Sequence, residues 1–125
     1  MTVQRPEPWV EELATAVRRM SLEVDAAIVE GRNDERGLRR AGFENPIYRC
    51  AEADGLVAFA SSISEPEVVI LTDFDPAGRR LNARLRELLP GRRVRVDWRR
   101  RVGKTLTAHG RRDVESLNNL FTRTW

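Results

Sequence analysis

Apolar positions along the chain follow helical spacing in some segments and extended spacing in others, and the two kinds alternate. Residues 8–21 place apolar side chains on one stripe, which predicts an amphipathic helix. Short continuous apolar runs bounded by turn residues predict buried strands. The predicted strands are residues 26–29, 46–50 and 68–71, and a fourth that contains Val94 and Val96 among arginines. Further helices are predicted at 34–41, 54–62 and 77–89 and at the end of the chain, 113–122. Residues 99–111 are basic and glycine-punctuated and predict no element.

This alternation of strands and helices predicts an α/β fold. We expect a Rossmann-like arrangement of about four mostly parallel strands, flanked by helices and joined by right-handed crossovers. A chain of 125 residues suits one compact domain.

Two acidic side chains follow the third predicted strand. Asp73 and Asp75 are one residue apart, so they project to the same side if the extended conformation persists that far. Neighbouring carboxylates raise each other's proton affinity unless a cation lies between them. A hard divalent ion, in first place Mg²⁺, relieves that repulsion.

A second acidic cluster follows the first predicted strand. Glu30 ends that strand, Gly31 makes a turn, and Asp34 opens a helix. Ligand sites in open parallel sheets form outside the carboxyl ends of the strands, so Glu30, Asp73 and Asp75 are expected to converge in one acidic pocket. Asp34 and Asp75 also suit helix N-caps, a role that does not account for Glu30 and Asp73.

Charge is unevenly distributed in this chain of net charge +3. Residues 1–89 carry 12 basic and 16 acidic side chains, whereas residues 90–125 carry 10 and 3. Arginines hold phosphates well, so the basic part suits a polyanionic partner; arginine richness also follows from genomic base composition. The single cysteine, and the lack of a secretory signal or a membrane-spanning apolar run, predict a cytoplasmic protein without a membrane partner.

Two interpretations of the basic segment around Trp98 remain open. Its cations and the indole suit single-stranded nucleic acid, held by charge and base stacking. A charged edge strand with Trp98 packed inward accounts for the pattern equally well. The residues expected to contact nucleic acid are Arg32, Arg79, Arg80, Arg99, Arg100, Arg101 and Lys104.

The two acidic motifs together resemble those of the Toprim domain, which topoisomerases, bacterial-type primases and the nucleases that mature small ribosomal RNA share. The residues that carry the resemblance are Ile28-Val-Glu-Gly-Arg-Asn-Asp34 and Ile70-Leu-Thr-Asp-Phe-Asp-Pro-Ala-Gly78. The chain is most similar to small stand-alone Toprim proteins of archaea and some bacteria. The resemblance implies a Toprim domain at 24–125, with residues 1–23 as a helical extension packed on it.

The resemblance also implies roles for individual residues. Glu30 would be a general acid or base and a metal ligand, Asp73 and Asp75 would bind Mg²⁺, and Asp34 would support them. Gly31 and Gly78 would let the backbone approach a phosphate. A later segment, Asp113-Val-Glu115, resembles an acidic segment of the small Toprim proteins.

These observations predict a phosphodiester hydrolase or phosphotransferase that depends on Mg²⁺, with Mn²⁺ as a substitute. The expected substrate is nucleic acid, RNA or DNA, with structured RNA preferred, and a larger RNA-processing or DNA-replication or repair partner is expected. One alternative is a docking module that binds nucleic acid or a partner through the metal without turnover. Another is a haloacid-dehalogenase-like phosphatase, but Ala77 replaces the usual threonine, Lys104 is the only lysine, and Glu30 has no role there.

Overall fold

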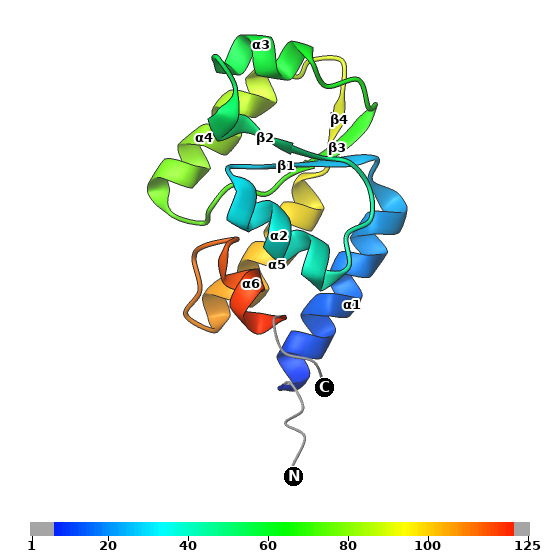
Figure 1. Cartoon of the computed structure of the whole chain (residues 1–125), viewed down its shortest axis with the longest axis vertical. Helices are drawn as coiled ribbons and strands as arrows, with labels where there is room; N and C mark the ends of the chain where they lie inside the picture. The colour runs from blue at the N-terminus through cyan, green and yellow to red at the C-terminus, as the bar shows by residue number, and fades with distance from the viewer. Residues whose placement is uncertain (1–6, 122–125) are drawn as a thin grey trace.

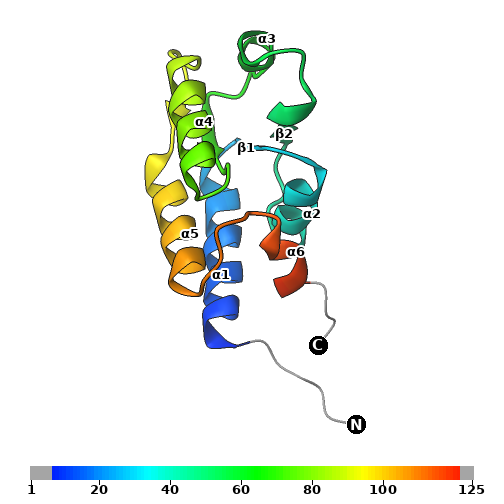
Figure 2. The ribbon, with the colours of Figure 1, turned by 90° about the vertical axis from the view of Figure 1, so that its left-hand side faces the viewer.

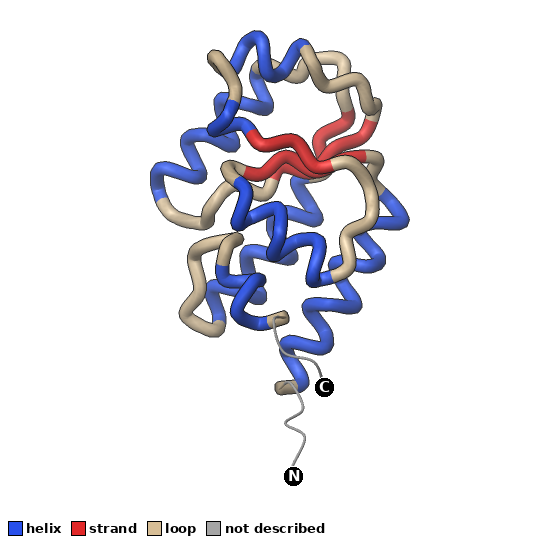
Figure 3. The backbone as a smooth tube through the Cα atoms, in the orientation of Figure 1, coloured by secondary structure: helices blue, strands red, loops and turns tan. Residues whose placement is uncertain are grey.

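Four short strands form one parallel sheet in the middle of the molecule (Figure 3). The computed structural model describes residues 7–121. The strands are β1 (Ala26–Val29), β2 (Ile47–Arg49), β3 (Glu67–Ile70) and β4 (Arg93–Val94), in the order β2-β1-β3-β4 with every neighbouring pair parallel. The two central strands, β1 and β3, are almost wholly buried, as expected for strands covered on both faces. The predicted Rossmann-like α/β fold is confirmed.

Helices cover both faces of the sheet (Figure 1). One face carries α1 (Pro8–Glu23), α2 (Arg32–Ala41), α5 (Val96–Ala108) and α6 (Ser116–Leu120), and the other carries α3 (Leu56–Ser61) and α4 (Pro76–Glu87). Alternate strand residues supply the two cores: Val29 and Val69 pack on the first face, and Ile28 and Ile70 on the second.

The first helix is integral to the larger core. The side chains of Leu13, Val17 and Met20 are buried in the same cluster as β1 residues, and α1 packs against α5 and α2. The division into an extension at 1–23 and a domain at 24–125 stays a prediction. Within residues 7–121 no helix is both long and apolar enough to cross a membrane.

The predicted fourth strand is wrong beyond Val94. β4 contains two residues, which pair with Glu67 and Val68, and the chain turns into α5 at Val96. Sequence analysis missed this helix because exposed arginines and a glycine obscured its buried stripe. That stripe repeats every fourth residue, at Trp98, Val102 and Leu106.

The basic segment differs from both interpretations in part, because it forms the helix α5 and not an edge strand, while Trp98 packs inward as the second interpretation expected. Its indole is 4% exposed, and its Nε1 donates a hydrogen bond to Glu23 Oε1 at 3.2 Å. Trp98 packs inward, so it offers no face to a nucleic-acid base.

Two further element boundaries differ from prediction. The second strand ends at Arg49, and a 3₁₀ turn (Cys50–Glu52) replaces its last residue. The terminal helix is shorter than predicted: α6 spans Ser116–Leu120, so the segment with Asp113 and Glu115 precedes it, and the predicted end at Thr122 lies outside the described residues.

Candidate metal centre

Three aspartates converge at the carboxyl edge of the sheet. Asp73 and Asp75 lie in the loop that joins β3 to α4, and Asp113 lies in the loop that joins α5 to α6. One carboxylate oxygen from each lies within 4.8 Å of the other two. Asp73 and Asp75 are half-buried and Asp113 is exposed, so a ligand can reach the cluster from solvent. Three carboxylates at this spacing form a donor set that suits a hard divalent cation.

Hydrogen bonds with two other chain segments fix Asp73 and the residue that follows it. Its backbone N–H donates to Glu30 Oε2 at 2.8 Å, and its carboxylate Oδ1 accepts from the backbone N–H of Val114 at 2.9 Å. The next residue, Phe74, donates its N–H to the carbonyl oxygen of Arg112 at 2.7 Å. These bonds bring the loop with Asp113 to the end of β3.

The predicted pocket of Glu30, Asp73 and Asp75 is therefore arranged differently from expectation. Glu30 contacts the backbone of Asp73 through one carboxylate oxygen, and it is not part of the three-aspartate group. Asp113 provides the third carboxylate instead. Its signal in the sequence was the segment Asp113-Val-Glu115, which sequence analysis noted without assigning a ligand to it.

Asp34 supports the turn that follows Glu30. Its Oδ2 accepts a hydrogen bond from the backbone N–H of Gly31 at 2.9 Å, which caps the start of α2. Burial raises the pKa of the Asp34 carboxyl, and the charges of Glu30 and Glu115 raise it further. Gly31 is extended, with φ −144°, and a Cβ there would have no neighbour within 4 Å, so its predicted approach to a phosphate stays a prediction.

The glycine at the start of α4 has a packing role. A Cβ on Gly78 would lie 2.0 Å from the carbonyl oxygen of Asp73, so only glycine lets α4 approach the loop. Its N–H donates to Asp75 Oδ1 at 2.7 Å, and its carbonyl accepts from Thr72 Oγ1 at 2.7 Å. Asp75 thus caps α4 with one oxygen while it belongs to the aspartate cluster. The missing side chain of Gly78 makes room for the backbone of Asp73, and its predicted approach to a phosphate stays a prediction.

The environment of Asp73 disfavours its charged form. The pKa of Asp73 is raised to about 6, mainly by burial. The nearby carboxylates of Glu30, Asp34 and Asp113 also raise it. The hydrogen bond from Val114 acts in the opposite direction. At neutral pH the centre is an anionic cluster with unrelieved repulsion, which a bound cation would neutralise.

Arg99 holds the loop that contains Asp73 through hydrogen bonds to its backbone carbonyls. Its Nη1 donates to the carbonyl oxygens of Thr72 at 2.7 Å and Ile70 at 3.3 Å, and its Nη2 donates to that of Asp73 at 3.2 Å. The guanidinium lies 4.7 Å from the centre of the Phe74 ring, and burial lowers the pKa of Arg99. Arg99 also lines the cavity between α4 and α5, and its predicted contact with nucleic acid stays a prediction.

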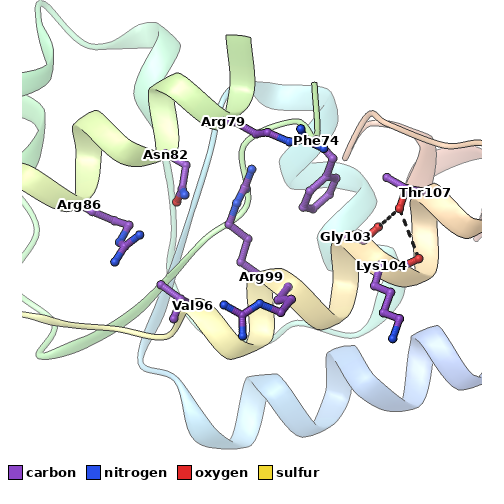
Figure 4. A pocket seen from close by; sticks show the side chains of 10 residues that line it. Phe74, Arg79, Asn82, Arg86, Val96, Arg99, Gly103, Lys104 and Thr107 are labelled. Atoms are coloured by element: carbon purple, nitrogen blue, oxygen red, sulfur yellow. Dashed lines mark hydrogen bonds between the residues drawn. The ribbon is translucent and has the colours of Figure 1, made fainter. Parts of the chain in front are cut away.

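Three of the other predicted basic residues border one cavity. Arg79, Arg100 and Lys104 line a cavity of about 490 Å³ between α4 and α5 (Figure 4). Two further polar residues on α4, Asn82 and Arg86, also line it and were not predicted from the sequence. Their spacing from Arg79 along one helix face was their signal.

The remaining predicted basic residues lie elsewhere. Arg80 is exposed on α4 and does not line that cavity, and Arg101 lies 5.1 Å from the centre of the Trp98 ring. Arg32 begins α2 and borders a shallow hollow whose other lining residues are Glu35, Arg36, Arg39, Arg40 and Arg49. The structure thus separates the predicted basic residues into several surfaces.

Comparison with known proteins identifies the family. A scan against protein-family models finds no match. The UPF0292 protein of Pyrococcus furiosus is 34% identical over 93% of this chain and 88% of that protein, and the UPF0292 protein of Methanocaldococcus jannaschii is 32% identical over 90% and 92%. A solved structure of a protein from Aquifex aeolicus matches with a TM-score of 0.64 and 25% identity over 85% of this chain and 95% of that one. The chain therefore belongs to the UPF0292 family.

Proposed function

We propose that this protein is a magnesium-dependent phosphodiester hydrolase or phosphotransferase of the Toprim type that acts on nucleic acid, with structured RNA as the expected substrate. One observation carries the proposal: the carboxylates of Asp73, Asp75 and Asp113 converge within 4.8 Å at the carboxyl edge of a parallel sheet. The resemblance of the two acidic motifs to the Toprim domain supports the same conclusion.

The residues of the centre fit Mg²⁺, and Mn²⁺ would suit the same ligands. All three side chains offer oxygen atoms, and burial together with the neighbouring carboxylates, which raise the pKa of Asp73, disfavours its charge unless a cation is bound. Held by Asp73, Asp75 and Asp113, Mg²⁺ would polarise the scissile phosphate and stabilise the leaving oxygen.

Glu30 is the residue best placed to act as a general base. Its Oε2 is fixed by the Asp73 N–H, whereas its Oε1 accepts no hydrogen bond from any residue in the described part of the chain. We assign Glu30 Oε1 to orient the attacking water and accept its proton. Arg79, exposed on the first turn of α4, would balance charge on the phosphate oxygens.

A phosphatase of the haloacid-dehalogenase type has less support. That mechanism needs a lysine beside the aspartate pair, and Lys104 instead lines the cavity between α4 and α5. It also needs the second aspartate as an acid or base, whereas Asp75 Oδ1 caps a helix. A larger RNA-processing or DNA-replication or repair partner and a cytoplasmic location remain predictions from the sequence.

The proposal is tested by cleavage of labelled structured RNA and single-stranded DNA in Mg²⁺, Mn²⁺ or chelator. Four variants are compared with the wild type: Asp73→Asn, Asp113→Asn, Glu30→Gln and, as a matched control, Asp54→Asn. Asp54 is an exposed aspartate in the loop before α3, so its variant has the same charge change outside the centre.

We expect metal-dependent cleavage by the wild type and by Asp54→Asn, and at least about a hundredfold less by the other three variants. Cleavage that survives in Asp73→Asn and Asp113→Asn would refute the proposal. Metal-dependent binding of intact nucleic acid, lost in Asp73→Asn, would instead identify a docking module without turnover.

A further inference from the structure

The cavity between α4 and α5 has a lining of one charge. Five of its ten lining residues are basic and none is acidic. In Figure 2, α4 lies above α5 along the left-hand edge of the view. In Figure 4, the side chains of Asn82, Arg86 and Phe74 extend into the space between them. A concave surface that gathers cations raises the local concentration of anions.

The exposed cations of this cavity lack carboxylate partners. Within residues 7–121, Arg79, Arg86, Arg100 and Lys104 form no ion pair. Four arginines outside the cavity are paired, namely Arg49, Arg84, Arg93 and Arg95, whereas others, such as Arg80 and Arg101, form no ion pair with any described residue. The cavity therefore concentrates like charges that only solvent or a bound anion can neutralise.

One neutral group in the lining suits a nucleobase. Asn82 Oδ1 has no hydrogen-bond partner in the described part of the chain, so it leaves an acceptor for an amino group. The Phe74 ring also borders the cavity, but it is buried and packs against Arg99, so we assign it no base contact. Phosphate alone would leave the Asn82 acceptor unused, whereas a nucleotide provides both an anion and an amino group.

The cavity continues toward the aspartate centre. A second hollow of about 510 Å³ shares Phe74, Arg79 and Thr107 with it. That hollow is also lined by Pro76 and Arg112, the chain neighbours of Asp75 and Asp113. Because Arg79 and Arg86 are seven residues apart on α4, the basic lining extends roughly 10 Å away from the centre.

We propose that the cavity between α4 and α5 holds a nucleotide of a single-stranded segment that continues from the aspartate centre. Successive phosphates of that segment would contact Arg86, Arg100 and Lys104, and the base would contact Asn82. The inference rests on the proposed function, since it names the strand on which the centre would act. A free mononucleotide offers the same phosphate and base, so the test compares binding of a single strand with binding of a free mononucleotide.

The test compares two double variants with equal charge change. Arg86→Gln/Arg100→Gln removes two cations from the cavity lining, one on each helix. Arg84→Gln/Arg93→Gln removes two cations outside it, on α4 and β4, whose partners are surface carboxylates. Binding of a fluorescent 12-nucleotide single strand, and of 5′-AMP in competition, is measured in EDTA over a range of salt, and thermal unfolding checks that each variant is folded.

We expect the cavity double variant to bind the single strand about tenfold or more weakly. Its plot of log affinity against log salt should be shallower by about 1.4, because each phosphate contact on a single strand contributes about 0.7. The outer double variant should stay within about twofold of wild type. Equal losses in the two doubles would overturn the inference, as would a cavity variant that loses 5′-AMP but not the single strand.

The two proposals can fail separately. A protein that binds single strands through the cavity in EDTA but never cleaves in Mg²⁺ would contradict the proposed function and leave this inference intact. A protein whose cleavage needs Asp73, and whose cavity double variant keeps wild-type strand binding, would contradict this inference alone.

Discussion

Replacing Asp73 with asparagine should stabilise the metal-free protein, although it removes a proposed ligand. Asparagine has nearly the same shape, and its Oδ1 can still accept the hydrogen bond from the Val114 N–H. The substitution removes only the negative charge, which burial and the neighbouring carboxylates disfavour. We therefore expect Asp73→Asn to raise the free energy of unfolding of the metal-free protein.

The sign and size of the effect follow from the pKa of Asp73. The folded protein raises that pKa from 3.8 to about 6, so at intermediate pH the folded state binds the proton more tightly than the unfolded state. The stability that Asp73 contributes by binding this proton is fully present below pH 3.8 and is lost as pH rises through 6. Two pKa units correspond to about 3 kcal/mol as an upper limit. Because Asp73 is partly exposed, solvent screening should reduce the effect to about 1–2 kcal/mol.

Urea unfolding in EDTA at pH 4 and pH 8 measures this effect. At pH 8 we expect the midpoint of Asp73→Asn to exceed that of the wild type by roughly 0.5–1 M urea. The difference should become much smaller at pH 4, where Asp73 is largely protonated in the folded protein. Mg²⁺ should raise the midpoint of the wild type at pH 8 and leave that of Asp73→Asn nearly unchanged.

The same measurement on Asp54→Asn controls for the loss of one negative charge from the surface, and should show a change within about 0.5 kcal/mol. A lower stability of Asp73→Asn than of the wild type at pH 8 in EDTA would contradict this prediction. A stability difference of equal size at pH 4 and pH 8 would also refute it, because the effect would then not depend on the charge.

Two further predictions concern residues that position the aspartate loop, and a third concerns the buried Trp98. Gly78→Ala should destabilise the protein by at least about 3 kcal/mol in urea unfolding, because its Cβ would meet the Asp73 carbonyl oxygen at 2.0 Å. Arg99→Met should lower the free energy of unfolding by about 2–4 kcal/mol and weaken Mg²⁺ binding measured by calorimetry, since the carbonyls of Thr72 and Asp73 lose their donor. Trp98→Phe should change single-strand affinity less than about twofold, whereas loss of a stacking base contact would cost about 1–3 kcal/mol of binding.

The sheet and the acids at its edge could be predicted because both depend on local sequence. The apolar runs that end at Val29 and near Leu71 are short and rich in β-branched residues, which identifies central strands. Acids placed directly after such runs must lie at the carboxyl edge, so the convergence of the segments with Glu30 and Asp73 followed from topology alone.

The remainder of the site depends on contacts between distant parts of the chain. Asp113 reaches the centre because the Phe74 N–H bonds to the Arg112 carbonyl, a pairing that no local pattern encodes. Gly37 contributes at a distance, since a Cβ there would lie 2.9 Å from Leu117 Cβ and would push away the helix that follows Asp113. Arg99 resembled its exposed neighbours in sequence, and only the packing of α5 against β3 separates its role from theirs.

The charges of the two proposed sites imply an order of binding. A phosphate brought beside the carboxylates of Asp73, Asp75 and Asp113 is repelled, by about 4 kcal/mol for one pair of unit charges 4 Å apart near a protein surface. The cavity that contains Arg100 and Lys104 has no acid in its lining, so a strand can bind there without metal. We therefore expect Mg²⁺ to increase affinity for single strands long enough to reach both sites and to leave affinity for 5′-AMP unchanged. Metal would then bind before the scissile phosphate arrives, while the basic cavity holds the adjoining nucleotide.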